Sequence, residues 1–176
     1  MAIDIRELTK ERHRSAERAE FVRILLSGAI KPRLYATYLW NQHIRYYALE
    51  VQAEKYGLLE GLESIKRSQR LYEDFQELWE DSAPPQTTQA AIEYQNYVKN
   101  IQNKSLLMTH IYVHHVGDMS GGQIIAKRVP GSHRFYEFEG DIPSLKDKIK
   151  SRITEDMVEE ANRCFDFVIH MFNELL

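Results

Sequence analysis

A histidine and a carboxylate lie one helical turn apart near the start of the chain. His13 and Glu17 are separated by four positions, so both side chains would project from the same face of a helix. A histidine that ligates a metal through one ring nitrogen is usually oriented by a hydrogen bond from the other nitrogen. Glu17 is placed to supply that partner. By spacing alone the indication is weak, because such a pair is more often a solvated surface pair.

The second pattern is a run of glycines around an aspartate. Three of the eight glycines fall within Gly117-Asp118-Met119-Ser120-Gly121-Gly122, with apolar helical sequence on both sides. Each glycine inside a helix costs roughly 1 kcal/mol relative to alanine. The missing side chains let backbone approach a flat ligand, or let the helix bend. The alternative is close packing of a neighbouring helix. Asp118 favours the ligand, because an ionisable group in a narrow gap needs a hydrogen-bonded or wet environment.

Other polar side chains are less specific. Tyr46, Tyr47 and Tyr112 could supply hydroxyls to a buried polar network, although each is more simply a core aromatic with one polar tip. The single cysteine, Cys164, excludes an intrachain disulfide and a cysteine zinc site, and its apolar surroundings predict a buried small hydrophobe. The remaining histidines show no spacing with carboxylates that suits a di-metal site. They are His43, His110, His114, His115, His133 and His170.

Taken together, these residues resemble the haem oxygenase family. The stretch 9–21, which contains His13 and Glu17, is similar to the family's proximal helix. The stretch 112–123 is similar to its distal helix, and the run Gly-Asp-Met-Ser-Gly-Gly-Gln is specific. The resemblance covers nearly the whole chain. It implies that haem is both cofactor and substrate, and that no flavin or other metal is needed.

The resemblance also implies roles for single residues. His13 would be the axial iron ligand, and Glu17 the partner of its other ring nitrogen. Gly117 and Gly121 would press backbone against the distal haem face, and Gly122 would give the helix its bend.

The polar groups of the distal and propionate sides complete this assignment. Asp118 would hold a water that hydrogen-bonds to bound dioxygen, with Tyr46 hydrogen-bonded nearby. Two positions depart from the family pattern: His114 stands where many members carry arginine, and Arg6 where a lysine is common. Cations and a hydroxyl on the propionate side would offset two carboxylates. These positions are Arg6, Lys10, Tyr112, Lys146 and Lys150.

The implied reaction is oxidative opening of haem at a meso carbon. It would consume O2 and release carbon monoxide, ferrous iron and biliverdin, with the IXα isomer expected. As in the soluble bacterial, algal and phage-type enzymes, electrons would come from ferredoxin, and a bilin reductase could take the product. The basic residues Arg6, Arg12 and Arg14, or the segment 146–152, are candidate docks for an acidic ferredoxin.

Two alternatives stay open from the sequence. A haem carrier or sensor would keep His13 without turnover, but binding alone does not need Asp118. A helical bundle of related fold could bind no haem, with the glycines serving packing alone. The pair formed by His13 and Glu17, together with the glycine run, argues against this second alternative.

Bulk composition is that of one soluble globular domain spanning 1–176. Hydrophobic residues make up 43% and charged residues 28% of the 176 positions. A net charge of -3 argues against a general nucleic-acid binder. No signal-peptide core and no apolar run of membrane-spanning length is present, so we expect a cytoplasmic protein with no membrane partner.

Helical periodicity dominates the chain and predicts an all-α fold. The expected architecture is a haem-oxygenase-like helical bundle, with haem between the proximal N-terminal helix and a glycine-kinked distal helix. Residues 131–143 are irregular and could hold a short strand, and the last helix could be interrupted near Thr154. The expected helices cover 3–27, 32–56, 65–80, 88–102, 105–129 and 144–175.

Overall fold

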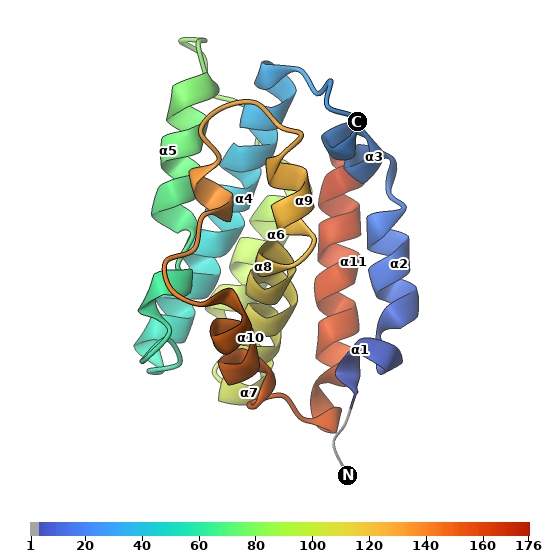
Figure 1. The fold of residues 1–176 in the computed structure, drawn as a ribbon, viewed down its shortest axis with the longest axis vertical. Helices are drawn as coiled ribbons and strands as arrows, with labels where there is room; N and C mark the ends of the chain where they lie inside the picture. Colours follow the sequence, from blue (N-terminus) through green and yellow to red (C-terminus); the bar gives the residue numbers. More distant parts are fainter. Residues whose placement is uncertain (1–3) are drawn as a thin grey trace.

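The computed structural model describes residues 4–176, and no strand occurs within that range (Figure 1). The predicted all-α class is therefore confirmed. The helices are α1 Ile5–Leu8, α2 Lys10–Glu17, α3 Glu20–Leu26, α4 Pro32–Lys55, α5 Ser68–Leu78, α6 Gln89–Lys99, α7 Lys104–Ile111, α8 Gly117–Met119, α9 Gly122–Ala126, α10 Ile142–Lys150 and α11 Val158–Glu174. Short 3-10 turns are η1 Glu63–Ile65, η3 Arg134–Tyr136 and η4 Glu155–Met157, and a π-helical turn, η2, covers Tyr112–Val116. Among the helices described, none combines the length and the apolar character needed to cross a bilayer.

The N-terminal segment forms three helices, so the prediction of one helix over 3–27 is wrong within the described residues. The first break is at Thr9, whose hydroxyl donates to the Ile5 carbonyl at 2.8 Å and whose φ of -110° leaves the helical range. The second break is at Ala19, which has an extended backbone with ψ of 141°. These two breaks make α2 a separate short helix, and this is the helix that holds His13.

The long helix α4 agrees with its predicted bounds. Pro32 occupies the first turn, where its missing N–H costs no hydrogen bond, and Gly57 follows the helix with a positive φ of 72°. The helix packs against α5 and α6 and is buried along most of its length. It therefore carries polar side chains such as Arg45 and Tyr46 into the interior of the bundle.

The segment predicted as one helix over 105–129 runs as α7, η2, α8 and α9. The π-helical turn inserts one extra residue into the helical path before Gly117. The helical path then breaks at Ser120, whose φ and ψ are -109° and -99°, and resumes in α9. The glycines therefore lie on both sides of a real break. The strand-like piece considered for 131–143 is the 3-10 turn η3 instead.

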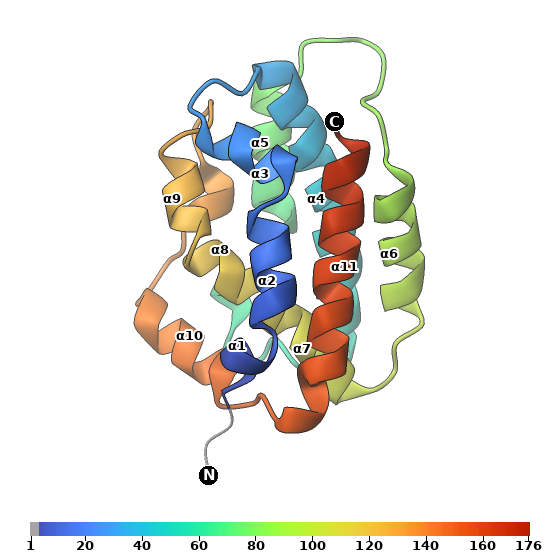
Figure 2. The same cartoon turned by 90° about the vertical axis from the view of Figure 1, so that its right-hand side faces the viewer.

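The C-terminal helix α11 connects the two parts of the molecule that the sequence singled out. Figure 2 shows α2 at the same height as α8, with α11 on the other side of α2. The helix packs against α2, α3, α6 and α7. The predicted interruption near Thr154 is confirmed, because α10 ends at Lys150 and α11 begins at Val158.

Candidate functional site

His13 and Glu17 form the pair that their spacing predicts. The Nε2 atom of His13 lies 3.0 Å from Oε1 of Glu17, and the imidazole packs on the Phe165 ring of α11 at a centroid distance of 5.5 Å. The side chain of His13 is 43% exposed. Glu17 thus contacts Nε2, and Nδ1 is the ring nitrogen left for a ligand. A concave surface of about 430 Å³ adjoins the ring, and its lining consists of Asp4, Arg6, Glu7, Lys10, His13, Arg14 and Glu17.

An exposed strip without side chains runs along the distal segment. Gly117, Ser120 and Gly121 are all exposed, and the exposed Ile124 continues the strip. Within the described residues, a Cβ atom added at Gly117 or at Gly121 would meet no atom within 4 Å apart from those of its chain neighbours and its own helical turn. These two glycines therefore do not make room for a neighbouring helix of this chain. Their backbone is open to a flat molecule, which removes the packing explanation at these two positions.

Gly122 has a different environment. A Cβ atom there would lie 2.9 Å from Cε1 of Tyr136, a buried ring that packs against Phe135. The expected role of Gly122 in bending the helix needs correction, because the break is at Ser120 and Gly122 has already joined α9. Gly122 instead lets η3 pack closely against the distal segment.

This contrast predicts opposite effects for two neighbouring alanines. Gly122→Ala should lower the free energy of unfolding by about 1 kcal/mol, since overpacking costs about 1–3 kcal/mol and the gain in helix propensity offsets about 1 kcal/mol. Gly121→Ala has a helical backbone and open space, so it should be neutral or stabilising by up to about 1 kcal/mol. Urea unfolding of both ligand-free variants measures this difference. Equal destabilisation of the two would contradict it.

Asp118 lies behind the open strip, inside the bundle. The Tyr46 hydroxyl donates to its Oδ2 at 2.8 Å, from a position 72 residues earlier in the chain. Burial raises the pKa of Asp118 well above its usual range, while the Tyr46 hydrogen bond and the charge of Arg67 act in the opposite direction. The structure therefore brings together the aspartate and the tyrosine that the sequence analysis paired. Tyr47, considered with Tyr46, is 55% exposed and belongs to no buried network.

Two buried ionic groups beside Asp118 escaped the sequence analysis. Arg67 is fully buried, donates to the carbonyls of Phe135 and Glu137 among others, and has a pKa lowered to about 10 by burial. Glu50 accepts from His115 Nε2 at 2.9 Å and from two backbone N–H groups. The sequence contains no periodicity that marks such groups, because a charged residue on a helix is ordinarily assigned to its solvated face.

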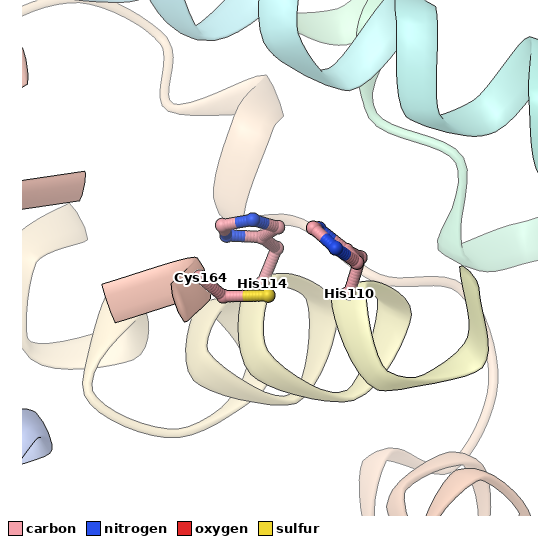
Figure 3. Close-up of side chains that lie close together, drawn as sticks. All are labelled: His110, His114 and Cys164. Carbon is pink, nitrogen blue, oxygen red and sulfur yellow. The ribbon is translucent and has the colours of Figure 1, made fainter. Parts of the chain in front are cut away.

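A further buried cluster joins α6, α7, η2 and α11. The hydroxyl of Tyr94 lies 2.8 Å from His110 Nδ1 and 3.0 Å from His114 Nε2, and His110 Nε2 lies 2.7 Å from Glu160 Oε2. Figure 3 shows the two imidazoles together with the Cys164 thiol, which is buried as predicted. One ligand atom from each of these three residues lies within 4.8 Å of the others, a grouping the sequence analysis did not anticipate. Three of the four ring nitrogens are committed to hydrogen bonds, so we interpret the cluster as a polar network.

The residues expected on the propionate side lie on four elements, α1, α2, η2 and α10, at one end of the bundle. Arg6 and Lys10 line the concave surface beside His13, and Lys10 pairs with Glu7 at 2.9 Å. Tyr112 is half-buried; burial raises its pKa, and the nearby Arg6 lowers it. Helix α10, which carries Lys146 and Lys150, packs against η2 and lies at the same end as α1 (Figures 1 and 2). Lys146 is half-buried and Lys150 is exposed.

Comparisons with known proteins agree on one family. The family model described as heme oxygenase matches residues 1–174. The sequence is 32% identical to the heme oxygenase of Guillardia theta, over 99% of this chain and 86% of that protein. The crystal structure of heme oxygenase-1 from the cyanobacterium Synechocystis sp., in complex with heme, superposes with a TM-score of 0.84 at 27% identity, covering 97% of this chain and 90% of that one. The heme oxygenase of Leptospira interrogans gives a TM-score of 0.83 at 27% identity, over 97% of both chains.

Proposed function

The chain belongs to the haem oxygenase family, and from that premise we propose that it binds haem between α2 and the glycine strip and opens the ring oxidatively. The products would be biliverdin, carbon monoxide and ferrous iron. The observation that carries this proposal is the open space at Gly117 and Gly121 in front of the buried Asp118. A packing role for the glycines would have filled that space with side chains.

The two walls fit a planar ligand that carries a metal at its centre. His13 offers one free ring nitrogen from α2 and is held by Glu17 at the other. The glycine strip offers backbone without side chains, which allows close approach to a flat face. When bound, haem supplies the iron that activates O2 and the meso carbon that is oxidised. The chain's part is to seat the ring, limit access to one edge, and supply protons.

Asp118 is suited to the proton-handling part. Its Oδ2 accepts from Tyr46, and Oδ1 has no hydrogen-bond partner among the residues described. Because burial raises the pKa of Asp118, the group holds a proton at higher pH than an exposed aspartate would. We therefore assign Asp118 to hold a water through Oδ1 on the distal side, with Tyr46 fixing the orientation of the carboxyl.

The finer features of the reaction follow from the resemblance and the placement of charge. Arg6, Lys10 and Tyr112 would bind one end of the haem, where its propionates lie, together with Lys146 and Lys150 of α10. This seating would select the meso carbon and give biliverdin IXα. Ferredoxin is the proposed electron donor, because exposed arginines on α1 and α2 offer positive charge beside the proposed haem edge.

One spectroscopic experiment tests the proposal. Purified protein is titrated with hemin, and then ferredoxin, ferredoxin reductase and NADPH are added in air. We expect a shifted Soret band on mixing, followed by its loss and the appearance of bilin absorbance. A Soret shift without bilin formation would indicate a haem carrier that does not open the ring. The absence of any shift on mixing would refute haem binding altogether.

A further inference from the structure

A continuous chain of hydrogen bonds leads from η2 through α6 and α7 to α11. It starts at His114, passes through Tyr94 and His110, and ends at Glu160. The three links measure 3.0, 2.8 and 2.7 Å. All four residues are buried, with His114 the most exposed at 6%. Burying a chain of polar groups costs free energy unless each group has its hydrogen-bond partners. Each link of this chain is formed, and we therefore ask what function the chain serves.

The two ends of this chain reach the places that a proton path needs. At the inner end, His114 lies four residues before Asp118, and its ring centroid is 5.7 Å from that of Tyr46. The His114 Nδ1 atom has no hydrogen-bond partner within 4–176. At the outer end, Glu160 accepts from the Tyr97 hydroxyl at 2.6 Å and pairs with Arg163, whose side chain is 47% exposed. The chain therefore runs from the ring that contacts Tyr46, the partner of Asp118, to a partly exposed ion pair.

The carboxylate at the outer end fixes the direction of every link. Glu160 only accepts, so neutral His110 carries its proton on Nε2 and accepts through Nδ1. Tyr94 must then donate its O–H to His110 Nδ1, and its oxygen accepts from His114 Nε2–H. The Arg45 guanidinium, a donor 3.4 Å from the same Nε2 atom, favours the other His114 tautomer, which is the one that occurs in the loaded state below. The His114 Nδ1 atom is left as a lone pair facing away from the chain. Burial lowers the pKa of both His110 and His114, which is consistent with this neutral resting arrangement.

We propose that His114, Tyr94, His110 and Glu160 form a proton relay that supplies the distal side of the haem site from solvent. This inference rests on the proposed function, because haem opening reduces O2 and consumes protons. In this chain the relay would operate beside the water held by Asp118, with His114 as its inner terminus. The position where many family members carry arginine would thus hold a group that can pass a proton on, which a guanidinium cannot.

Delivery of one proton is balanced along the chain. In the loaded state His110 is an imidazolium facing the Glu160 carboxylate. It donates Nδ1–H to Tyr94, Tyr94 donates O–H to His114 Nε2, and His114 carries its proton on Nδ1. When that Nδ1 proton passes to a base on the distal side, the Tyr94 proton moves to His114 Nε2 and the His110 Nδ1 proton moves to Tyr94. Three N–H or O–H bonds break and three form. The resting arrangement returns. Reloading adds one solvent proton to His110 at the Glu160 end, and it also requires a turn step in which the two imidazole rings flip and the Tyr94 hydroxyl rotates to donate to His114.

The charged and titratable groups around His114 favour transfer of a proton through this residue over its retention there. Arg45 of α4 lies over the Tyr94 ring at 4.5 Å and within 3.4 Å of His114 Nε2. Its positive charge opposes a resting imidazolium at His114. The His110 ring is faced by Tyr97 from α6 and by Cys164 and the Glu160–Arg163 pair from α11. Among residues 4–176, Glu160 is the one carboxylate in direct contact with the relay, so the loaded proton is stabilised at the outer end.

Tyr94→Phe tests the relay by removing its central hydroxyl while keeping the ring. The measurement is the single-turnover rate of bilin formation in haem-loaded protein, in H2O and in D2O. We expect haem affinity within about twofold of wild type, a rate lowered about tenfold or more, and an altered solvent isotope effect. Tyr97→Phe is the matched control. It also removes a hydroxyl bonded to the cluster, from a half-buried tyrosine. This hydroxyl is a branch on Glu160 rather than a link, so the rate should change by less than about twofold.

A second variant keeps the test decisive if Tyr94→Phe folds poorly. Glu160→Gln retains an oxygen and a donor for its neighbours but cannot hold the counter-charge of a loaded His110, and it should slow turnover to a similar degree. A wild-type rate and isotope effect in the folded variants would overturn the relay and leave the haem oxygenase assignment intact. A wild-type protein that binds hemin without forming bilin would instead refute the proposed reaction.

Discussion

Replacing His13 by alanine is expected to abolish haem turnover while leaving the bundle folded. The side chain is 43% exposed and its ion pair with Glu17 lies at the surface, so its loss should cost no more than about 1 kcal/mol of stability. The effect on activity should be large, because His13 is the proposed iron ligand and no other histidine lines the concave surface beside α2. We expect bilin formation to fall by at least about a hundredfold. Added imidazole should restore part of it by occupying the space that the side chain leaves.

The chain contains its own control for this substitution. His170 and Glu174 on α11 are also four residues apart, and their closest atoms are 3.4 Å apart, with a similarly exposed histidine. His170→Ala removes the same kind of surface pair far from the glycine strip. It should leave the Soret band and the turnover rate unchanged. If His13→Ala retained full activity, the iron ligand would have to be sought elsewhere.

Asp118→Asn should separate haem binding from ring opening. The amide can still accept from Tyr46 through its oxygen, so the fold and the Soret shift of the hemin complex should persist. The amide cannot hold or release the proton that the carboxyl does, and general acid–base groups contribute about 10²–10⁴-fold to rate. We therefore expect bilin formation to drop by at least about a hundredfold at unchanged haem affinity. Wild-type yield from the variant would refute the proposed role.

The same variant should be more stable than the parent, and the gain should depend on pH. Burial raises the folded-state pKa of Asp118 above its unfolded value of about 3.9, so the folded state binds the proton more tightly. Below the unfolded pKa the aspartate carries no ionisation penalty. As pH rises to the folded pKa, the parent loses stability, by about 1.4 kcal/mol for each unit between the two values. In urea unfolding between pH 4 and pH 8, the free energy of unfolding of Asp118→Asn should exceed that of the parent by an amount that grows with pH.

Asp74 provides the contrast for this stability prediction. It is also buried, but it accepts from the Phe135 N–H at 2.8 Å and pairs with Arg134 at 3.0 Å. Asp74→Asn would weaken charge-assisted hydrogen bonds that hold η3 in place, so it should destabilise the protein by about 1–3 kcal/mol. A gain in stability from both substitutions would mean that burial of any carboxylate, rather than the setting of Asp118, sets the effect.

The sequence predicted those features that depend on local signals. Pro32 and Gly57 bracket α4, and the spacing of His13 and Glu17 predicts their contact on α2. The breaks at Thr9 and Ala19 were missed because neither glycine nor proline marks them. Thr9 and Ala19 are both compatible with a helix, so we attribute the two breaks to the packing of α2 and α3 against α11.

The buried polar groups were missed for a different reason. Arg67 and Glu160 form hydrogen bonds with partners that are distant in sequence, as in the bonds from Arg67 to the Phe135 carbonyl and from Tyr97 to Glu160. Sequence spacing predicts contacts within one helix, but it contains no information on contacts between helices. The resemblance identified the pair of Tyr46 and Asp118, because both positions match the family pattern. It implied no role for Tyr94.

The π-helical turn at Tyr112–Val116 sets the rotational phase between two halves of one helical path. Each residue of an α-helix advances the side chains by about 100°, so one inserted residue rotates everything after it by that angle relative to an uninterrupted helix. Upstream of the turn, His110 faces α6 and α11; downstream, the glycine strip faces outward while Asp118 faces Tyr46. Removing a single residue from 112–116 would restore regular α-helix and turn Asp118 away from Tyr46. The orientation of Asp118 therefore depends more on the number of residues in 112–116 than on which residues they are.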